Sequence, residues 1–123
     1  MARKIRILVV DDDPAVLRLL ETALTHFGHL PSLCPDGATA LEKAVPGAYD
    51  LLLLDYRMGS PDGLEVLKRL RQRGLETPVI LMSSHFPEDV ADRCADDRRT
   101  TLLLKPFHLR SLREEIERLL ESS

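Results

Sequence analysis

Several residue types that mark other classes of protein are scarce in this sequence of 123 residues. It has no tryptophan, only 4% aromatic residues and two cysteines, Cys34 and Cys94. Two distant cysteines cannot build a disulfide framework or a cysteine-rich metal site, so we expect reduced thiols in a cytoplasmic protein. No apolar run approaches the length of a membrane span, and the N-terminus lacks the apolar core of a signal peptide. These scarcities argue against a membrane as partner.

Charge of one sign is not concentrated in any segment. Acidic and basic residues make up 30% of the chain, alternate along it and sum to a net charge of -3. The absence of a Lys/Arg stripe argues against nucleic acid as a direct ligand. The length fits one domain that covers residues 1–123, and a content of 44% hydrophobic residues is ordinary for a globular core.

What the sequence does contain is a regular alternation of strand-like and helix-like segments. Short apolar runs predict five strands, at residues 7–10, 30–34, 51–54, 78–82 and 102–104. Stretches with apolar residues at helical spacing follow them, and this alternation is typical of βαβ units and a parallel sheet. Pro31 has no amide hydrogen to donate, which predicts an edge position for the second strand.

Helix ends are also marked in the sequence. Asp13, directly before a proline, predicts a helix N-cap. Asp62 and Glu65 predict a capping pair at the start of a later helix. Gly28 and Gly74 stand where two helices are expected to stop.

Polar side chains stand at the ends of four of the five strands. The run Leu51-Leu52-Leu53-Leu54 ends at Asp55, and the other runs lead into Asp11-Asp12-Asp13, Ser83-Ser84 and Lys105-Pro106. The carboxyl ends of parallel strands share one edge of the sheet, and ligands bind at that edge in open α/β folds. Carboxylates, a hydroxyl and an ammonium gathered there indicate a site for a phosphoryl group and a divalent cation.

The acids predict the chemistry of this edge. Asp11, Asp12 and Asp55 would bring like charges together, which costs stability unless a cation binds among them. Mg²⁺ fits, because it binds carboxylates, a carbonyl oxygen, waters and phosphate oxygens. Asp55 is the candidate nucleophile for an aspartyl phosphate, with Lys105 as a second positive charge and Ser83 as a hydroxyl donor. Simpler interpretations are an ion-pair lysine at Lys105 and a helix-entry hydroxyl at Ser83.

Taken together, these residues resemble the receiver domain of two-component response regulators. The resemblance covers residues 3–121 and implies a flavodoxin-like, doubly wound α/β fold with five parallel strands in the order 2-1-3-4-5, built as (βα)5. The matching residues, in order, are Leu8-Val9-Val10-Asp11-Asp12, Leu54-Asp55, Met58, Asp62-Gly63, Ser83 and Lys105-Pro106-Phe107.

The resemblance implies a role for each residue around the acceptor. Asp55 would accept a phosphoryl group from a sensor histidine kinase or a phosphotransfer protein. Mg²⁺ would be held by Asp12 and Asp55, by Asp11 through a water, and by the backbone carbonyl of Arg57. Lys105 would contact the phosphoryl group and precede a cis peptide bond.

The resemblance also implies how the signal leaves the domain. Ser83 would move toward the phosphoryl group and alter a protein-interaction surface formed by the fourth helix, the fifth strand and the fifth helix. A downstream protein would bind there. The domain would catalyse its own phosphorylation and slow dephosphorylation, and it would not be an enzyme with an external substrate.

Three positions depart from the family pattern. Gly59 stands where a proline is usual, and a proline follows two places later at Pro61. Leu102 stands where the family usually carries an aromatic switch residue, and a leucine has no ring to move. The segment 97–99 replaces the usual glycine-alanine before the fifth strand.

Two alternative functions remain open on the sequence alone. One is a degenerate, phosphate-independent receiver that acts as a docking module, which Gly59 and Leu102 favour. The other is a phosphohydrolase that uses an aspartyl intermediate. The second is disfavoured because Arg57, and no acid, stands two residues after Asp55.

Overall fold

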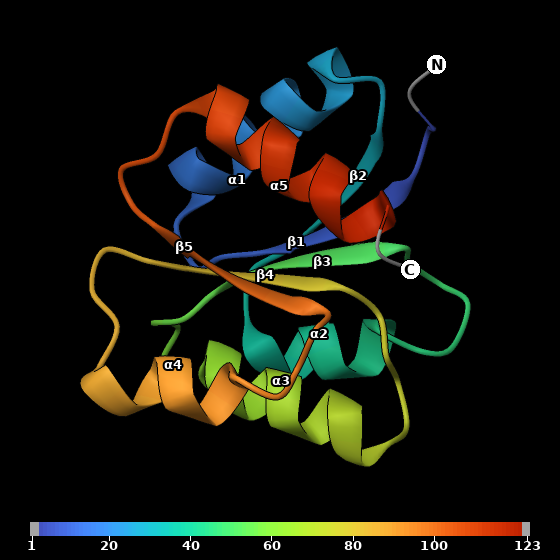
Figure 1. The fold of residues 1–123 in the computed structure, drawn as a ribbon. Coiled ribbons are helices and arrows are strands. Elements are labelled where there is room, and N and C mark those ends of the chain that lie inside the picture. Colours follow the sequence, from blue (N-terminus) through green and yellow to red (C-terminus); the bar gives the residue numbers. More distant parts are fainter. Residues whose placement is uncertain (1–2, 122–123) are drawn as a thin grey trace.

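The computed structural model describes residues 3–121, which form a five-stranded parallel sheet in the order β2-β1-β3-β4-β5 with helices on both faces (Figure 1). The strands are β1 (Arg6–Val10), β2 (Leu30–Cys34), β3 (Leu51–Asp55), β4 (Val79–Ser83) and β5 (Thr100–Leu104). The helices are α1 (Pro14–His26), α2 (Gly37–Lys43), α3 (Gly63–Gln72), α4 (Glu88–Cys94) and α5 (Leu109–Glu121). The predicted fold and strand order are confirmed.

Burial along the strands explains why their sequences differ. Every residue of β3 and β4 is buried, because these strands lie inside the sheet and are covered by helices on both faces. The edge strands β2 and β5 are only partly buried, and Pro31 lies on an edge as predicted. β5 begins at Thr100, two residues before the predicted start, because Thr100 and Thr101 pair with β4 although neither is apolar.

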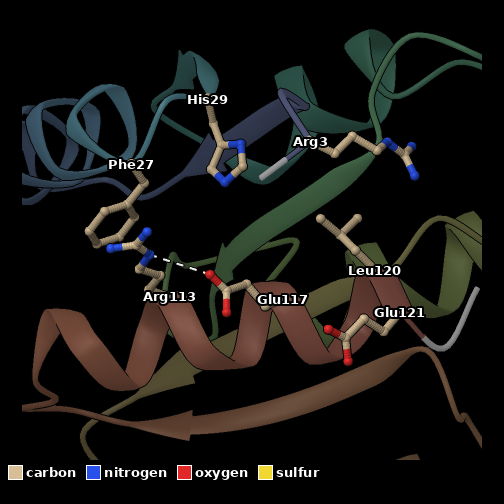
Figure 2. A pocket seen from close by; sticks show the side chains of 7 residues that line it. All are labelled: Arg3, Phe27, His29, Arg113, Glu117, Leu120 and Glu121. Atoms are coloured by element: carbon tan, nitrogen blue, oxygen red, sulfur yellow. Dashed lines mark hydrogen bonds and ion pairs between the residues drawn. The ribbon is translucent and has the colours of Figure 1, made fainter. Parts of the chain in front are cut away.

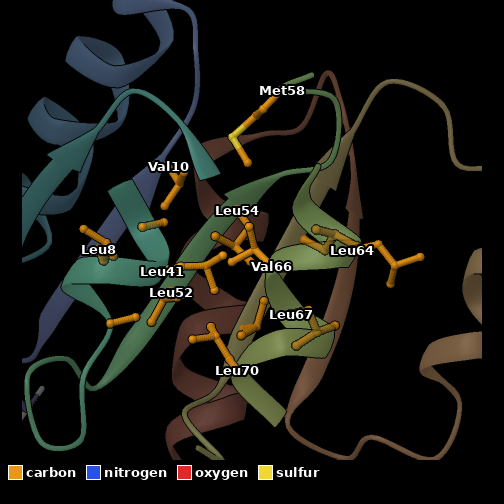
Figure 3. Close-up of a cluster of buried hydrophobic side chains, with 14 of the residues drawn as sticks. Leu8, Val10, Leu41, Leu52, Leu54, Met58, Leu64, Val66, Leu67 and Leu70 are labelled. Carbon is orange, nitrogen blue, oxygen red and sulfur yellow. The ribbon is translucent and has the colours of Figure 1, made fainter. Parts of the chain in front are cut away.

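The sheet separates two hydrophobic clusters. Helices α1 and α5 cover one face, and α2, α3 and α4 cover the other (Figure 1). Alternate residues of one strand enter different clusters: Leu54 packs toward α2 and α3, and Leu53 packs toward α1 and α5. Figure 3 shows the cluster beneath α2 and α3, where Leu54 lies beside Leu41 and Val66. Each fully buried leucine contributes about 1.5–3 kcal/mol to stability relative to an exposed one.

The predicted helix ends are confirmed. The Asp13 side chain accepts a hydrogen bond from the Ala15 amide at 2.9 Å. Asp62 and Glu65 form a reciprocal capping box at the start of α3. In α5, Leu112 and Ile116 are buried, whereas Leu109, the first residue of the helix, is 39% exposed.

The structure also bears on two predictions made from the sequence, that the cysteines are reduced and that no segment spans a membrane. Both cysteine thiols are free and buried, and burial raises the pKa of each above its ordinary value of 9.0. Between residues 3 and 121, none of the helices is both long enough and apolar enough to cross a membrane.

His29 is a buried histidine at the edge of the sheet that is remote from the acids. It is 7% exposed, and its Nδ1 accepts a hydrogen bond from the amide of Ile5 at 3.3 Å. In Figure 2 its ring points toward α5, where Arg113 lies over the Phe27 ring and pairs with Glu117 at 3.3 Å. Burial lowers the pKa of His29 below its ordinary value of 6.5, Arg113 lowers it further, and Glu117 opposes both.

We expect His29 to make the fold sensitive to acid. Because its pKa is lower in the folded state, the unfolded chain binds more protons as pH falls below about 6.5. The stabilising contribution is therefore complete above that pH and is lost on acidification. His29→Asn retains an acceptor near the Nδ1 position and does not titrate. Urea unfolding between about pH 5 and 7 should show a smaller pH dependence in His29→Asn than in the wild type.

The matched control is His26→Asn, which removes an exposed histidine from α1. It makes the same replacement at an exposed site, so a change in pH dependence that both variants share would not be specific to the buried position of His29. Equal pH dependence in His29→Asn and the wild type would contradict the assignment to His29.

Candidate functional site

The predicted site residues meet at the carboxyl edge of the sheet. Asp11 follows β1, Asp55 and Ser83 are the last residues of β3 and β4, and Lys105 follows β5. One carboxylate oxygen from each of Asp11, Asp12 and Asp55 lies within 4.8 Å of the other two. Asp11 and Asp55 are 1% and 7% exposed, whereas Asp12 faces solvent. Two acids are thus fixed in the sheet edge, and the third is open to an incoming ligand.

Lys105 links the two buried acids. Its Nζ donates to Asp55 Oδ1 at 3.0 Å and to Asp11 Oδ2 at 3.2 Å. Asp11 Oδ1 also accepts from the Asp13 amide at 2.9 Å, so Asp11 is held from two sides. The peptide bond between Lys105 and Pro106 is cis, as the resemblance implied. The positions of Asp55 and Lys105 are therefore set by the strands and by each other.

The electrostatics of the site favour a bound cation. Burial raises the pKa of Asp55 above its ordinary 3.8, the hydrogen bond from Lys105 opposes this, and the charges of Asp11 and Asp12 add to it. Burial alone would lower the pKa of Lys105, but the bond to Asp55 and the two acidic charges raise it. Lys105 thus supplies one positive charge at a cluster of three carboxylates, and the remaining negative charge suits a hard divalent ion.

These donors fit Mg²⁺. Carboxylate oxygens from Asp11, Asp12 and Asp55 are close enough for one ion to bind all three directly or through water. Arg57, predicted to contribute its backbone carbonyl, lies two residues after Asp55 in the β3–α3 loop, and its side chain is exposed. The Arg57 carbonyl remains a predicted ligand.

Ser83 is buried at the site, but its hydroxyl is engaged within its own loop. It donates to the His85 carbonyl at 2.7 Å and accepts from the His85 amide at 3.2 Å. The side chain of His85 itself is exposed. The hydroxyl therefore lies at the same edge of the sheet as the acids but is bonded within its own loop in this state.

The loop between Asp55 and α3 contains Gly59 and Pro61, the two positions at which the sequence departs from the family pattern after the acceptor. Gly59 adopts φ +80°, in the left-handed region that favours glycine, and the bond from Ser60 to Pro61 is cis. The Gly63 amide donates to the Tyr56 carbonyl at 2.9 Å and closes the loop.

Sequence reasoning missed the steric role of Gly63. A Cβ at this position would lie 2.5 Å from the Asp55 carbonyl oxygen and 2.7 Å from Leu81 Cδ1. The first turn of α3 therefore packs directly against the backbone of Asp55. The available signal was a glycine at the start of a helix, where it disfavours helix formation and so needs another reason.

The fold and the site define a flavodoxin-like α/β domain that gathers acids and one lysine at the carboxyl edge of its sheet. The family model described as "Response regulator receiver domain" matches residues 7–117, and the chain belongs to this family of two-component systems. Receiver domains bind Mg²⁺ through acidic residues, as the cluster of three acids here would. They are not enzymes in the usual sense.

The curated relatives are transcriptional and response regulators. The chain is 39% identical over 110 residues to the transcriptional regulatory protein TcrA of Mycobacterium tuberculosis, covering 88% of this chain and 43% of TcrA. It is 34% identical over 119 residues to the transcriptional regulatory protein CiaR of Streptococcus pneumoniae, covering 97% and 53%. The chain thus spans about half the length of these relatives.

Solved structures agree with the fold. The receiver domain of the Francisella response regulator 1452 matches with a TM-score of 0.86 and 27% identity, over 97% of this chain and 98% of that one. Response regulator TrrA of Thermotoga maritima, solved in complex with Mg²⁺-BeF, matches with a TM-score of 0.82 and 32% identity, over 95% and 99%.

Proposed function

We propose that this domain is a phosphorylation-controlled switch in which Asp55 receives a phosphoryl group from a histidine kinase or a phosphotransfer protein. The observation that carries the proposal is the placement of Asp55, which is buried at 7% exposure, bonded to Lys105 and grouped with two further acids. An acid packed against the sheet for structural reasons alone would not need two other carboxylates beside it.

The proposed reaction is a direct displacement. A carboxylate oxygen of Asp55 attacks phosphorus, the bond from phosphorus to the donor imidazole nitrogen breaks, and its electron pair remains on that nitrogen. Mg²⁺, held by Asp11, Asp12, Asp55 and the Arg57 carbonyl, would neutralise negative charge on the transferring oxygens. Lys105 supplies the second positive charge, and Ser83 then donates its hydroxyl to a phosphoryl oxygen.

The test is incubation with acetyl phosphate, with and without Mg²⁺, followed by intact-protein mass spectrometry. We expect the mass of one phosphoryl group to be added only with Mg²⁺ and only when Asp55 is present. No added phosphoryl group in the wild type, or equal addition in Asp55→Asn, would overturn the proposal.

The docking-module alternative makes a different prediction for the metal. A phosphate-independent receiver has no need of an ion, so amide resonances near Asp12 and Asp55 would not shift when Mg²⁺ is titrated. The proposed switch requires such shifts. The three oxygens within 4.8 Å of one another favour the switch, because their repulsion has a use only when a cation binds.

The donor protein needs a surface next to Asp55, and the fold offers an apolar one. A hollow of about 410 Å³ lies between α1 and the loop after β5, beside Lys105. Its wall includes Leu19, 59% exposed, and Leu109, 39% exposed, together with Val16 and Phe107. We infer that the protein that carries the phosphohistidine packs a helix against this hollow, because Lys105, which bonds Asp55 at 3.0 Å, forms part of its wall.

Leu19→Asp should therefore separate donor docking from chemistry. Transfer from a phosphohistidine protein should slow by about 10-fold or more, as expected when an interface anchor is lost. Labelling by acetyl phosphate should stay at the wild-type rate, because Leu19 does not contact the acids. Measuring both initial rates tests this, with Leu30→Asp, an exposed leucine on β2, as the control. Equal transfer rates in Leu19→Asp and Leu30→Asp would contradict this docking site.

The proposed output surface is formed by α4, β5 and α5, where a downstream protein would bind. β5 is an edge strand, and part of it is exposed beside both helices. We place the protein in the cytoplasm, where histidine kinases present their phosphohistidine.

A further inference from the structure

Two aromatic rings join the acceptor strand to the loop that precedes α4. Tyr56 directly follows Asp55, and Phe86 lies three residues after Ser83. Their ring centroids are 5.8 Å apart at an interplanar angle of 51°, within the range of attractive aromatic pairs. Both rings are half-buried and pack, together with Leu102, on the hydrophobic cluster beneath α2, α3 and α4.

The hydroxyl of Ser83 is bonded to the segment that carries Phe86, through the backbone of His85. A serine has one hydrogen to donate, and Ser83 donates it to the His85 carbonyl at 2.7 Å. If the hydroxyl donates instead to a phosphoryl oxygen on Asp55, that bond to His85 must break. His85, immediately before Phe86, then loses the shorter of its two bonds to the Ser83 hydroxyl and keeps the longer one, donated by its amide at 3.2 Å.

The other end of α4 is fastened independently. Arg71 of α3 bonds Asp97, beyond the C-terminal end of α4, at 2.8 Å, and it also donates to the Leu75 and Thr77 carbonyls at 2.9 and 2.8 Å. Asp97 accepts a second bond from the Arg99 amide at 3.0 Å. None of these groups touches the acceptor site, so this attachment should persist when Asp55 is modified.

We propose that the Tyr56–Phe86 ring pair couples the acceptor to α4, so that phosphorylation releases the Phe86 end of the helix while the Arg71–Asp97 end stays fixed. The inference rests on the proposed function. Leu102 has no ring, so it cannot couple the acceptor to α4 by rotating an aromatic side chain. The inference assigns that coupling to Tyr56 and Phe86.

The first experiment uses Tyr56 as its own probe. The chain has two tyrosines and no tryptophan, so Tyr49→Phe leaves Tyr56 as the single intrinsic fluorophore of this kind. Adding Mg²⁺ and beryllofluoride, a stable phosphoryl mimic, should change Tyr56 emission because its neighbour Phe86 moves. Bound beryllofluoride is verified separately by ¹⁹F NMR.

The second experiment measures amide hydrogen exchange with and without beryllofluoride. Exchange in residues 86–90 should accelerate by about 5-fold or more, which is the lower end of the effects by which one site usually alters another. Exchange in residues 97–100 should stay constant. In Phe86→Leu this acceleration should largely disappear although the mimic still binds. Phe27→Leu, which removes a ring on the opposite face of the sheet, should retain it.

The outcomes separate the two proposals. If no mimic binds and acetyl phosphate adds nothing, the proposed function fails and the coupling fails with it. If the mimic binds but Tyr56 emission is constant, or if Phe86→Leu shows the wild-type acceleration, only the coupling through the ring pair is overturned.

Discussion

Asp55→Asn is expected to incorporate no phosphoryl group from acetyl phosphate or from a histidine kinase. An amide oxygen is a much weaker nucleophile than a carboxylate oxygen, and no equivalent acid can replace it. Asp11 is 1% exposed and bonded to Lys105, and Asp12 is the N-terminal neighbour of a helix cap. Mass spectrometry of intact protein and of peptides should therefore find a complete loss, and labelling that moves to Asp11 or Asp12 would contradict the assignment.

The same variant should reveal the electrostatic cost of the site. The pKa of Asp55 is raised from 3.8 in the folded state, chiefly by burial. Such a group adds stability below its ordinary pKa and loses that contribution as pH rises through the folded value. Without Mg²⁺, the free energy of unfolding of Asp55→Asn minus that of the wild type should grow as pH rises above about 4 toward 7.

Mg²⁺ provides the control for this measurement. The wild type should gain stability with Mg²⁺, by about 2.7 kcal/mol at a concentration 100 times the dissociation constant, whereas Asp55→Asn should gain less. Urea unfolding at several pH values measures both effects. A difference between the two proteins that does not vary with pH would contradict the role assigned to burial of the Asp55 carboxylate.

Gly63→Ala is the second change with a large expected effect. The added methyl would lie 2.5 Å from the Asp55 carbonyl oxygen and 2.9 Å from the Tyr56 Cα, so backbone must shift. Overpacking of this kind costs about 1–3 kcal/mol in unfolding free energy. Because the shifted backbone carries the acceptor, the initial rate of phosphorylation should fall by about 100-fold, as for a misplacement of about 1 Å.

Gly74→Ala is the matched control for the loss of stability. Gly74 has φ +81° and no atoms within 4 Å of an added Cβ, so alanine there adds strain without contact. Strain in this backbone region costs about 1–3 kcal/mol. Gly74→Ala should lose a similar amount of stability yet phosphorylate at the wild-type rate. If the two variants have the same rate, Gly63 does not position Asp55.

The fold followed from the sequence because its central strands are apolar on both faces. The run Leu51-Leu52-Leu53-Leu54 is typical of a strand covered by helices on both faces, and β3 is buried throughout. The edge strands were harder to delimit. Thr100 and Thr101 pair with β4 through backbone groups, which apolar patterning cannot detect. The predicted strand 102–104 therefore left out both threonines.

The members of the site were also predictable, but their contacts were not. Strand ends placed Asp11, Asp55 and Lys105 on one edge, because parallel strands share their direction. The hydrogen bonds of Ser83 to His85 depend on the path of a loop, and the ring contact between Tyr56 and Phe86 joins two loops. Neither contact follows from the spacing of apolar or polar residues along the sequence.

The sheet that divides the interior has a consequence for how such a domain diversifies. Leu53 and Leu54 are adjacent in sequence but pack in different clusters, so substitutions on opposite faces should be nearly additive in stability. Residues of α1 at the proposed donor surface can therefore change without disturbing the residues beneath α4 that are proposed to transmit the signal. Selection for a new upstream kinase and selection for a new downstream target can act on the same chain as separate traits, with the acids at the sheet edge common to both.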